Sequence, residues 1–327
     1  MTEGKREEML SAAYTVLGRL KSEIGKVVSG KEKETELLIC ALVAGGHVLI
    51  EDVPGVGKTT LATALARAAG LSFRRAQFTP DVMASDITGF NMYNRKTESF
   101  EFRQGLVNTN ILLADEINRA SPKTQSSLLE AMEEMKVTVD GVTYDVPQPF
   151  TVIATQNPMG FVGTFPLPEA QLDRFAVRLS MGYPDKDQEL NILRRRRVEN
   201  PMSSIVPLPD PSVIMECRRV AETVYVSELV ESYIIDLVSQ TRNRSELSLG
   251  ASPRASLALM KLSRAKALME KRDFVRPEDI AELYISAVSH RVSLSRDAIA
   301  SGMTAETVLA DILKTTKVPF LTGAGSK

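Results

Sequence analysis

Cysteine, histidine and tryptophan are scarce in this sequence. Its 327 residues include no tryptophan, two cysteines and two histidines. Cys40 and Cys217 lie far apart in the chain, which excludes a disulfide framework or a zinc cluster and suits a reducing compartment. His47 and His290 have no partner at metal-ligand spacing, so we expect them to act in packing or as polar caps.

Long apolar runs and an excess of one charge are also missing. The longest apolar stretch, Leu37 to Ile50, is interrupted by two glycines and a histidine and is too short for a membrane span. The opening residues MTEGKREEML lack the apolar segment of a secretory signal. The 40 basic residues nearly balance the 41 acidic ones, so no overall field attracts nucleic acid or an anionic membrane. These absences predict a cytoplasmic protein without a membrane span.

Short apolar runs alternate with helical patterns in the first half of the chain. Strands are predicted at Val48 to Ile50, Phe73 to Phe78, Ile111 to Ala114, Phe150 to Thr155 and Val177 to Met181. Strands separated by helices indicate a mostly parallel sheet with helices on both faces. A helix from about Glu3 to Lys26 precedes the first strand, and Ser29 with Glu32 predicts a capping box for the next helix.

The pattern changes beyond Pro184. Helical periodicity is found at Asp187 to Val198, Pro211 to Tyr225, Glu228 to Thr241, Arg254 to Met269 and Pro277 to His290. We therefore predict an α/β nucleotide-binding domain at 1–184, with an N-terminal helix, followed by a smaller all-helical lid domain at 185–327. Within the lid, the cationic run Arg194 to Arg197 ends a helix that opens with acids, and it is interpreted as a solvated face.

Two segments of the first domain resemble hairpins. Lys136 to Val146 reads KVTVDGVTYDV, with two β-rich runs around Asp140-Gly141, the pair typical of a type I′ turn. Phe90 to Arg103 carries a weaker pattern in which Phe100 and Phe102 alternate with polar residues. Both are predicted to be inserts, either binding surfaces or decorated surface loops.

A glycine-rich segment, VLIEDVPGVGKTTLATALARAAG, joins the first predicted strand to an amphipathic helix. Gly55 and Gly57 would let backbone N–H groups close around a β-phosphate at the start of this helix. Lys58 can reach the β- and γ-phosphate oxygens, and the Thr59 hydroxyl can bind Mg²⁺. Asp52 stands where the general pattern GxxxxGK[ST] has its first glycine. The alternative is an ordinary glycine-rich turn between a strand and a helix.

Two further strand ends carry polar residues that suit ATP chemistry. ILLADEINRA ends an apolar strand with Asp115, in reach of Mg²⁺, and Glu116, which can polarise a water beside the γ-phosphate. Acids at a helix start are also common as capping charge, but Ser121-Pro122 already predicts the cap of the next helix. TVIATQNP ends with Asn157, whose amide could lie beside that water or simply close an Asn-Pro turn.

Two arginines complete the candidate site. Arg174 follows an aspartate in PEAQLDRF, and Arg254 follows a predicted Ser252 cap and Pro253 in GASPRAS. Taken singly, each is as easily explained as a solvated surface arginine. The interpretation rests on the ordered set of motifs.

This ordered set resembles the AAA+ superfamily and, within it, most closely the MoxR family. The resemblance is carried by HVLIEDVPGVGKTTLA, RAQFTPDVMASDITG, LLADEINRASPKTQSSLLEAMEE, IATQNP, FPLPEAQLDRF and GASPRAS, and it covers nearly the whole chain. It implies an ATP-binding Walker A loop at Pro54, Gly55, Val56, Gly57, Lys58, Thr59 and Thr60, with Mg²⁺ on Thr59 and Asp115. It further implies Walker B at Asp115 and Glu116, sensor 1 at Asn157, an arginine finger at Arg174 and sensor 2 at Arg254.

The resemblance also implies a working environment for the chain. MoxR-type ATPases are cytoplasmic homo-oligomers, often hexameric rings, that act in assembly, activation or cofactor insertion of protein complexes with a partner bearing a von Willebrand factor A domain. The segments Phe90 to Arg103 and Lys136 to Val146 correspond to the insert in helix two and the hairpin before sensor 1, both expected to meet a client. We expect Arg174 to serve a neighbouring subunit and Arg254 the nucleotide of its own subunit.

Three other functions are compatible with parts of the pattern. A nucleic-acid-dependent AAA+ motor carries similar hairpins, but the near-neutral charge and the lack of an appended basic or zinc module speak against it. A chelatase-type motor subunit would need a porphyrin-binding partner. A nucleotide-gated binding module without turnover is disfavoured by the intact Glu116.

Overall fold

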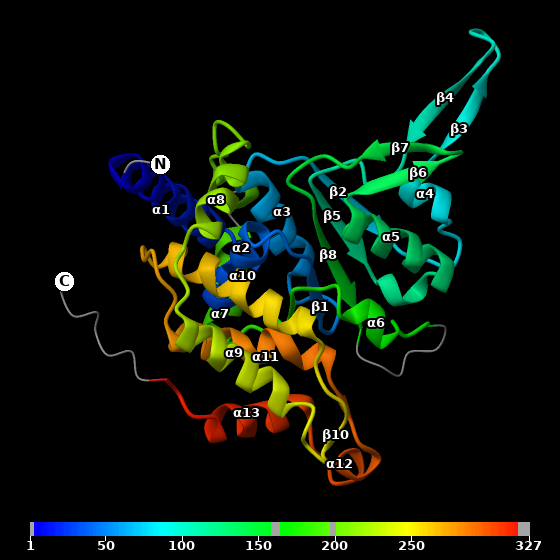
Figure 1. The fold of residues 1–327 in the computed structure, drawn as a ribbon. Helices are drawn as coiled ribbons and strands as arrows, with labels where there is room; N and C mark the ends of the chain where they lie inside the picture. Colours follow the sequence, from blue (N-terminus) through cyan, green and yellow to red (C-terminus); the bar gives the residue numbers. More distant parts are fainter. Residues whose placement is uncertain (1–2, 158–163, 197–200, 320–327) are drawn as a thin grey trace.

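The computed structural model of the chain describes residues 3–157, 164–196 and 201–319 (Figure 1). Five parallel strands form its central sheet in the order β2-β5-β8-β1-β9. They are β1 Val48–Glu51, β2 Phe73–Gln77, β5 Ile111–Asp115, β8 Thr151–Gln156 and β9 Val177–Leu179. The predicted parallel sheet is confirmed, with strand ends shifted by one or two residues.

The side chains of the sheet strands point alternately to its two faces, so the core has two layers. Val48 and Ile50 of β1 pack into one cluster with α1 Glu3–Gly25, α2 Glu32–Val43 and α3 Lys58–Ala68. Leu49 points to the other face, where it joins α5 Pro122–Glu134 and the short helix α4 Ala84–Thr88. Because successive side chains of a strand point to opposite faces, a strand of uniform hydrophobicity supports helices on both sides. Figure 1 shows α3 and α5 on opposite sides of the strands.

The predicted cap of α2 is wrong. Lys31 precedes the first helical residue and makes no side-chain cap, while the Glu32 carboxylate accepts the Gly30 N–H at 3.1 Å. Gly30 has a φ of 73°, and this left-handed turn moves the helix start past Ser29. By contrast, Ser121 caps α5 and Ser252 caps α10 Pro253–Met269 as predicted, each followed by proline.

Both predicted hairpins are present. β3 Gly89–Asn94 pairs with β4 Ser99–Gln104, and β6 Lys136–Val139 pairs with β7 Val142–Asp145. Asp140 and Gly141 both have positive φ, 50° and 81°, as a type I′ turn requires. Figure 1 shows β3 and β4 projecting away from the body of the molecule, with β6 and β7 at their base.

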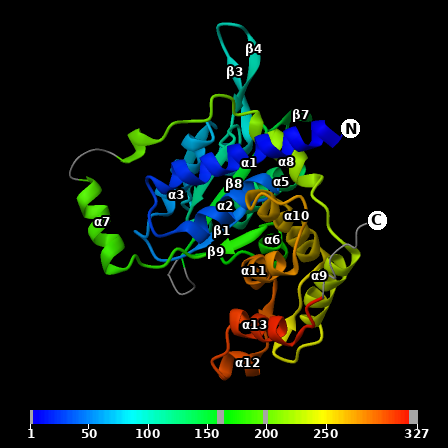
Figure 2. The same ribbon diagram turned by 90° about the vertical axis from the view of Figure 1, so that its left-hand side faces the viewer.

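In the described residues beyond Pro184, helices predominate and the strands are those of one short ribbon. The longer helices of this region are α7 Lys186–Arg196, α8 Val213–Glu222, α9 Glu228–Gln240, α10 Pro253–Met269, α11 Pro277–Val288 and α13 Ala305–Thr315, with the shorter α12 Arg296–Ala300 before α13. Another short helix, α6 Glu169–Leu172, lies earlier in the chain, before β9. The unpredicted ribbon joins β10 Leu247–Leu249 to β11 Ser293–Leu294. Figure 2 shows α7 standing apart from α9, α10 and α11. Arg197 of the cationic run and Pro158 of the Asn-Pro pair lie outside the described residues.

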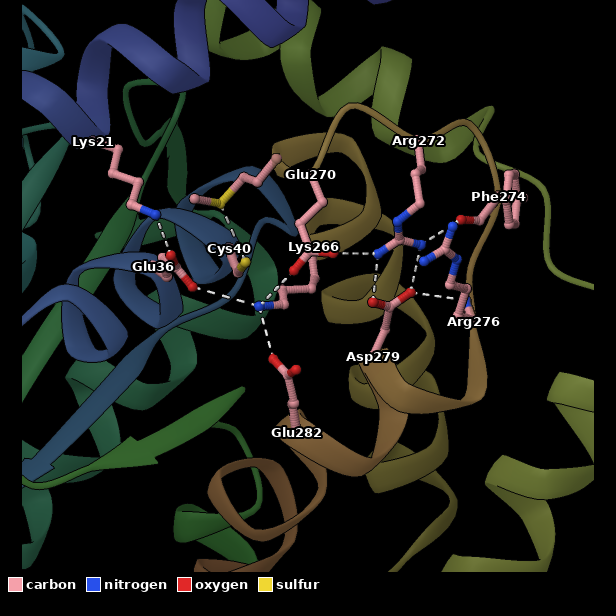
Figure 3. A network of polar contacts seen from close by, with 11 residues as sticks. Lys21, Glu36, Cys40, Lys266, Glu270, Arg272, Phe274, Arg276, Asp279 and Glu282 are labelled. Atoms are coloured by element: carbon pink, nitrogen blue, oxygen red, sulfur yellow. Dashed lines mark hydrogen bonds and ion pairs between the residues drawn. The ribbon is translucent and has the colours of Figure 1, made fainter. Parts of the chain in front are cut away.

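A charge cluster around the buried Lys266 connects the lid helices to the first domain (Figure 3). Lys266 of α10, with only 11% of its side chain exposed, pairs with Glu36 of α2 at 3.4 Å, Glu270 at 2.9 Å and Glu282 of α11 at 2.8 Å. Nearby, the Cys40 thiol of α2 donates to the Met269 sulfur at 3.4 Å. Since α10 packs along α2, the start of α10 is carried to the edge of the sheet where the strands begin.

Candidate functional site

The glycine-rich loop lies at the carboxyl end of β1 and leads directly into α3. Gly55 and Gly57 have φ values of 88° and 96°, in the left-handed region that favours glycine. Lys58 is the first residue of α3, and its buried ammonium donates to the Asp52 carbonyl at 2.8 Å. A Cβ added at Gly55 would meet nothing within 4 Å, so the backbone there is open to a ligand. This geometry fits a phosphate group at the start of a helix.

Asp52 has a role that the sequence pattern did not predict. Its carboxylate accepts the N–H groups of Val53, Met181 and Gly182 at 2.8, 2.6 and 2.7 Å and the Ser180 hydroxyl at 2.9 Å. Burial alone would raise the pKa of the Asp52 carboxyl, but these hydrogen bonds outweigh it and lower the pKa. The residue therefore ties the phosphate loop to the end of β9. Its only signal in the sequence is an acid where glycine is usual.

The predicted acids and amide meet beside this loop. Asp115 ends β5, and its carboxylate accepts the Thr155 hydroxyl at 2.7 Å and the Arg75 guanidinium at 2.6 Å. Glu116 follows with a φ of 56°, and its carboxylate accepts the Asn157 amide at 3.3 Å. This left-handed backbone conformation turns the Glu116 side chain away from the strand. The side chains of Glu116 and Asn157 therefore point toward the same region.

Charges link this group to Lys58. Burial lowers the pKa of the Lys58 ammonium, although the carboxylates of Asp115, Asp52 and Glu116 oppose that shift. Lys58, Asp115, Glu116 and Asn157 are thus brought together as predicted.

Several supporting residues around the acids were missed by the sequence analysis. Arg119 donates to Glu116 at 2.9 Å, and the Thr155 hydroxyl accepts the Glu116 N–H at 2.9 Å while donating to Asp115. Arg75 comes from the neighbouring strand β2. The contacts of Arg75 and Thr155 depend on which strands lie side by side, which no local pattern indicates, whereas Arg119 is only three residues from Glu116.

The turn between α1 and α2 forms a further border of the phosphate loop. Lys31 donates to the Met181 carbonyl, and Gln188 of α7 donates to the Gly30 carbonyl at 3.3 Å. Met181 in turn lies 3.7 Å from the position a Cβ at Gly57 would take. This border was also missed, because the turn has no motif of its own.

Arg174 and Arg254 lie together on the opposite edge of the sheet. Both pair with Glu133 at the end of α5, at 2.8 Å for Arg174 and 2.5 Å for Arg254. Arg174 precedes β9, and Ala176 donates to the His47 carbonyl at 2.8 Å, at the amino end of β1. At about 3.3 Å per residue, the four residues of β1 separate the two edges by about 13 Å.

The expected contact between Arg254 and the nucleotide of its own subunit is therefore wrong for this structure. The packing of α10 along α2 places Arg254 beside Arg174 and away from Lys58. A cavity of about 300 Å³ opens at this edge. Four cations, Arg174, Arg254, Lys261 and Arg291, and two acids, Glu133 and Asp173, line it among other residues. Its net positive charge suits an anion supplied from outside the subunit.

The two histidines are structural. His47 is buried, accepts the Val152 N–H at Nδ1 and donates to the Met132 carbonyl at Nε2, both at 3.0 Å. Burial lowers the pKa of His47 to about 4. His290 is also buried and bonds the Phe175 carbonyl at 2.8 Å. The prediction of packing and polar capping is confirmed.

Comparison with known proteins agrees with this geometry. The model of the "ATPase family associated with various cellular activities (AAA)" matches residues 47–177, and the AAA lid domain matches residues 239–312. Chaperone MoxR1 of Mycobacterium tuberculosis is 38% identical over 95% of this chain and 85% of its own length. The chain belongs to the MoxR family of AAA+ ATPases. It is accordingly an ATP-binding protein and an ATPase, with the relationship to chaperones that the family implies.

Other relatives of this MoxR-family chain span nearly its whole length. Uncharacterized protein YeaC of Bacillus subtilis is 46% identical over 94% of this chain and 96% of its own. A putative ATPase from Cytophaga hutchinsonii, solved as a crystal structure, superposes with a TM-score of 0.90 at 37% identity and covers 97% of this chain and 99% of its own. None of the helices in the described ranges is long and apolar enough to cross a membrane.

Proposed function

We propose that the chain hydrolyses Mg-ATP at the interfaces of a homo-oligomeric ring, a hexamer, in the cytoplasm and uses the energy to remodel a protein client. The task is assembly, activation or cofactor insertion of a protein complex, with a partner that bears a von Willebrand factor A domain. One observation carries the proposal: Lys58, Glu116 and Asn157 lie at one edge of the sheet, while Arg174 and Arg254 lie at the other. A second copy would join the two edges into one site.

The phosphate-loop edge supplies binding and the activation of water. Residues Pro54 to Thr60 surround the phosphates, and Lys58 leaves the Asp52 carbonyl to bind the β- and γ-phosphate oxygens. The oxygen donors of Thr59 and Asp115 are of the kind that Mg²⁺ prefers, and the ion when bound neutralises phosphate charge. Glu116 polarises the attacking water, and Asn157 orients Glu116 and that water through its amide.

The arginine edge supplies positive charge to the neighbour. Arg174 and Arg254 release Glu133 and bind the γ-phosphate held by the adjacent subunit, where they neutralise the charge that develops during transfer to water. This assignment extends the expected finger role of Arg174 to Arg254. Turnover then depends on assembly, because no subunit holds a complete site.

The hairpins supply a surface for the client. Tyr93 and Phe100 stand exposed on the projecting β3-β4 hairpin, with their rings in edge-to-face contact at 5.4 Å. Phe102, which the sequence analysis grouped with Phe100, instead stacks on Tyr144 at 3.9 Å and joins the two hairpins. Client contact is therefore assigned to Tyr93 and Phe100, and Phe102 to the hairpin framework.

The test uses a Glu116→Gln variant, which should bind ATP but retain it unhydrolysed. With ATP, this variant should capture a protein from lysate of the source organism, and the purified protein should stimulate the wild-type ATPase. Tyr93→Ser with Phe100→Ser should abolish capture when added to Glu116→Gln. In the otherwise wild-type chain, the same two substitutions should abolish stimulation while leaving basal hydrolysis intact. Tyr225→Ser, which alters an exposed lid tyrosine, is the matched control. Stimulation by DNA that weakens with salt would instead support a nucleic-acid motor.

A further inference from the structure

Residues of the lid contact both neighbours of Arg174, the carboxylate of Asp173 and the backbone carbonyl of Phe175. The Arg291 guanidinium donates to the carbonyl of Phe175 at 2.6 Å and forms an ion pair with the Asp173 carboxylate at 3.2 Å. His290 bonds the same Phe175 carbonyl at 2.8 Å. The two residues on either side of Arg174 are therefore both held by one arginine of the lid, Arg291.

The same carboxylate reaches the start of α10. Asp173 accepts the hydroxyl of Ser252 at 2.8 Å, and Ser252 is the N-cap that accepts the Arg254 N–H at 3.1 Å. One acid thus contacts the residue that anchors the Arg174 loop and the residue that opens the helix of Arg254. The two arginines are joined through Asp173 as well as through Glu133.

These contacts are buried, unlike the pairs of the arginines themselves. Only 3% of the Arg291 side chain and 17% of the Asp173 side chain are exposed, against 28% for Arg174 and 49% for Arg254. A buried ion pair often contributes little net stability, because desolvation offsets the attraction. The Asp173–Arg291 pair instead fixes the position of the segment around Arg174, whose guanidinium must be placed accurately on another molecule.

We propose that Asp173 is a positioning residue that, through Arg291 and Ser252, sets Arg174 and Arg254 at one spacing for the nucleotide of the neighbouring subunit. The inference rests on the proposed function, in which both arginines act on that nucleotide. It adds that the lid of each subunit aligns the two arginines, Arg174 and Arg254, that this subunit provides to its neighbour. Small errors of placement are costly in catalysis, up to about 100-fold for a shift of about 1 Å.

Asp173→Asn is the central variant, because the amide keeps the shape and can still accept the Ser252 hydroxyl while the charge opposite Arg291 is lost. In the full-length protein we expect kcat to fall on the order of tenfold. The Kd for ATP should change by less than about twofold, because the phosphate loop lies at the other edge of the sheet. Mixing with Lys58→Ala subunits should restore part of the turnover, because those subunits donate an intact Arg174 loop.

Substitutions of Ser252 keep the test available if Asp173→Asn does not fold. Ser252→Ala should lower kcat in the same way, and Ser252→Thr, which keeps the hydroxyl, should restore it. Ser227→Ala is the matched control, since Ser227 caps α9 through Val230 and the loss of a helix cap is equivalent. It should lower stability similarly without changing kcat.

The inference is overturned if folded Asp173→Asn keeps kcat within about twofold of wild type, or if Ser227→Ala and Ser252→Ala lower it equally. It is also overturned if Arg174→Ala is rescued by Lys58→Ala subunits and Asp173→Asn is not, since that pattern means a general structural defect. Absence of rescue for Arg174→Ala itself would contradict the proposed function instead. The two failures are therefore distinguishable.

Discussion

The two edges of the sheet are built in different ways. At the carboxyl edge, Lys58 directly follows the glycine-rich loop after β1, Asp115 ends β5 and Asn157 follows the adjacent strand β8, so the parallel sheet alone brings them together. At the amino edge, Arg174 and Arg254 meet only because the lid packs on the first domain. The first edge can bind a nucleotide by itself. In the proposed function, the second acts only on a nucleotide that another subunit holds, so mutations at the two edges should have different effects.

The largest expected effect is at the carboxyl edge. Lys58→Ala removes the cation that we propose binds the β- and γ-phosphates, so ATP affinity should fall by at least about 100-fold. Arg254→Ala, which removes a cation from the amino edge, should leave the affinity of the isolated subunit nearly unchanged. Titration with a fluorescent ATP analogue at low protein concentration measures both. Near-normal affinity in Lys58→Ala would remove the phosphate-loop assignment.

As the pH falls, the contribution of the amino edge to folding stability should be lost before that of the carboxyl edge. His47 has a pKa of about 4 in the folded chain against 6.5 as its ordinary value, so the unfolded state binds protons first and stability is lost as the pH falls from 6.5 to 4. Asp52 has a lowered pKa, so its contribution is lost only as the pH falls below its ordinary 3.8. His290, whose pKa burial also lowers, adds to the loss in the first window.

Urea unfolding at pH 7 and pH 4.5 measures this difference. His47→Gln should reduce the loss of unfolding free energy between the two pH values by about 2 kcal/mol. Asp52→Asn should leave that loss unchanged, because Asp52 stays ionised in both states over most of the interval. An identical pH dependence in wild type and His47→Gln would show that His47 is not the group responsible.

The smallest expected effect is at Glu133, the carboxylate that occupies both arginines in the free subunit. Exposed ion pairs are worth about 0.2 to 1 kcal/mol each, so Glu133→Gln should raise the ATPase rate about two- to tenfold by freeing Arg174 and Arg254. Glu134→Gln, the adjacent exposed acid, is the control. The measurement is the steady-state ATPase rate over a range of protein concentrations. A lower rate in Glu133→Gln would mean that Glu133 aligns the arginines in the active ring.

Prediction of the structure from the sequence succeeded where the geometry depends on local patterns. The strands, the phosphate loop and the Asp115, Glu116 and Asn157 group followed from apolar runs that end in polar residues. The parallel order of the sheet then brought those ends to one edge. The type I′ hairpin followed from Asp140-Gly141, because few other residue pairs accept two positive φ angles.

Prediction failed where distant segments decide the geometry. Arg254 was assigned to the wrong edge because its position depends on Lys266 and Glu36, which are 230 residues apart in sequence. Phe102 had the same alternating pattern as Phe100, and only its contact with Tyr144 distinguishes them. The anchoring roles of Asp52 and Asp173 were likewise invisible, because their partners belong to other elements.

The central claim is that the two edges of neighbouring subunits form one site, and a mixing experiment tests it most directly. Arg174→Ala and Lys58→Ala subunits are combined over a range of ratios, with co-assembly verified by cross-linking, and ATP turnover is measured. Each variant alone should be nearly inactive, and the mixture should regain turnover with a maximum at intermediate ratios, because the Lys58→Ala subunit lends its Arg174 to an intact phosphate loop. Co-assembled mixtures as inactive as either variant alone would contradict the account.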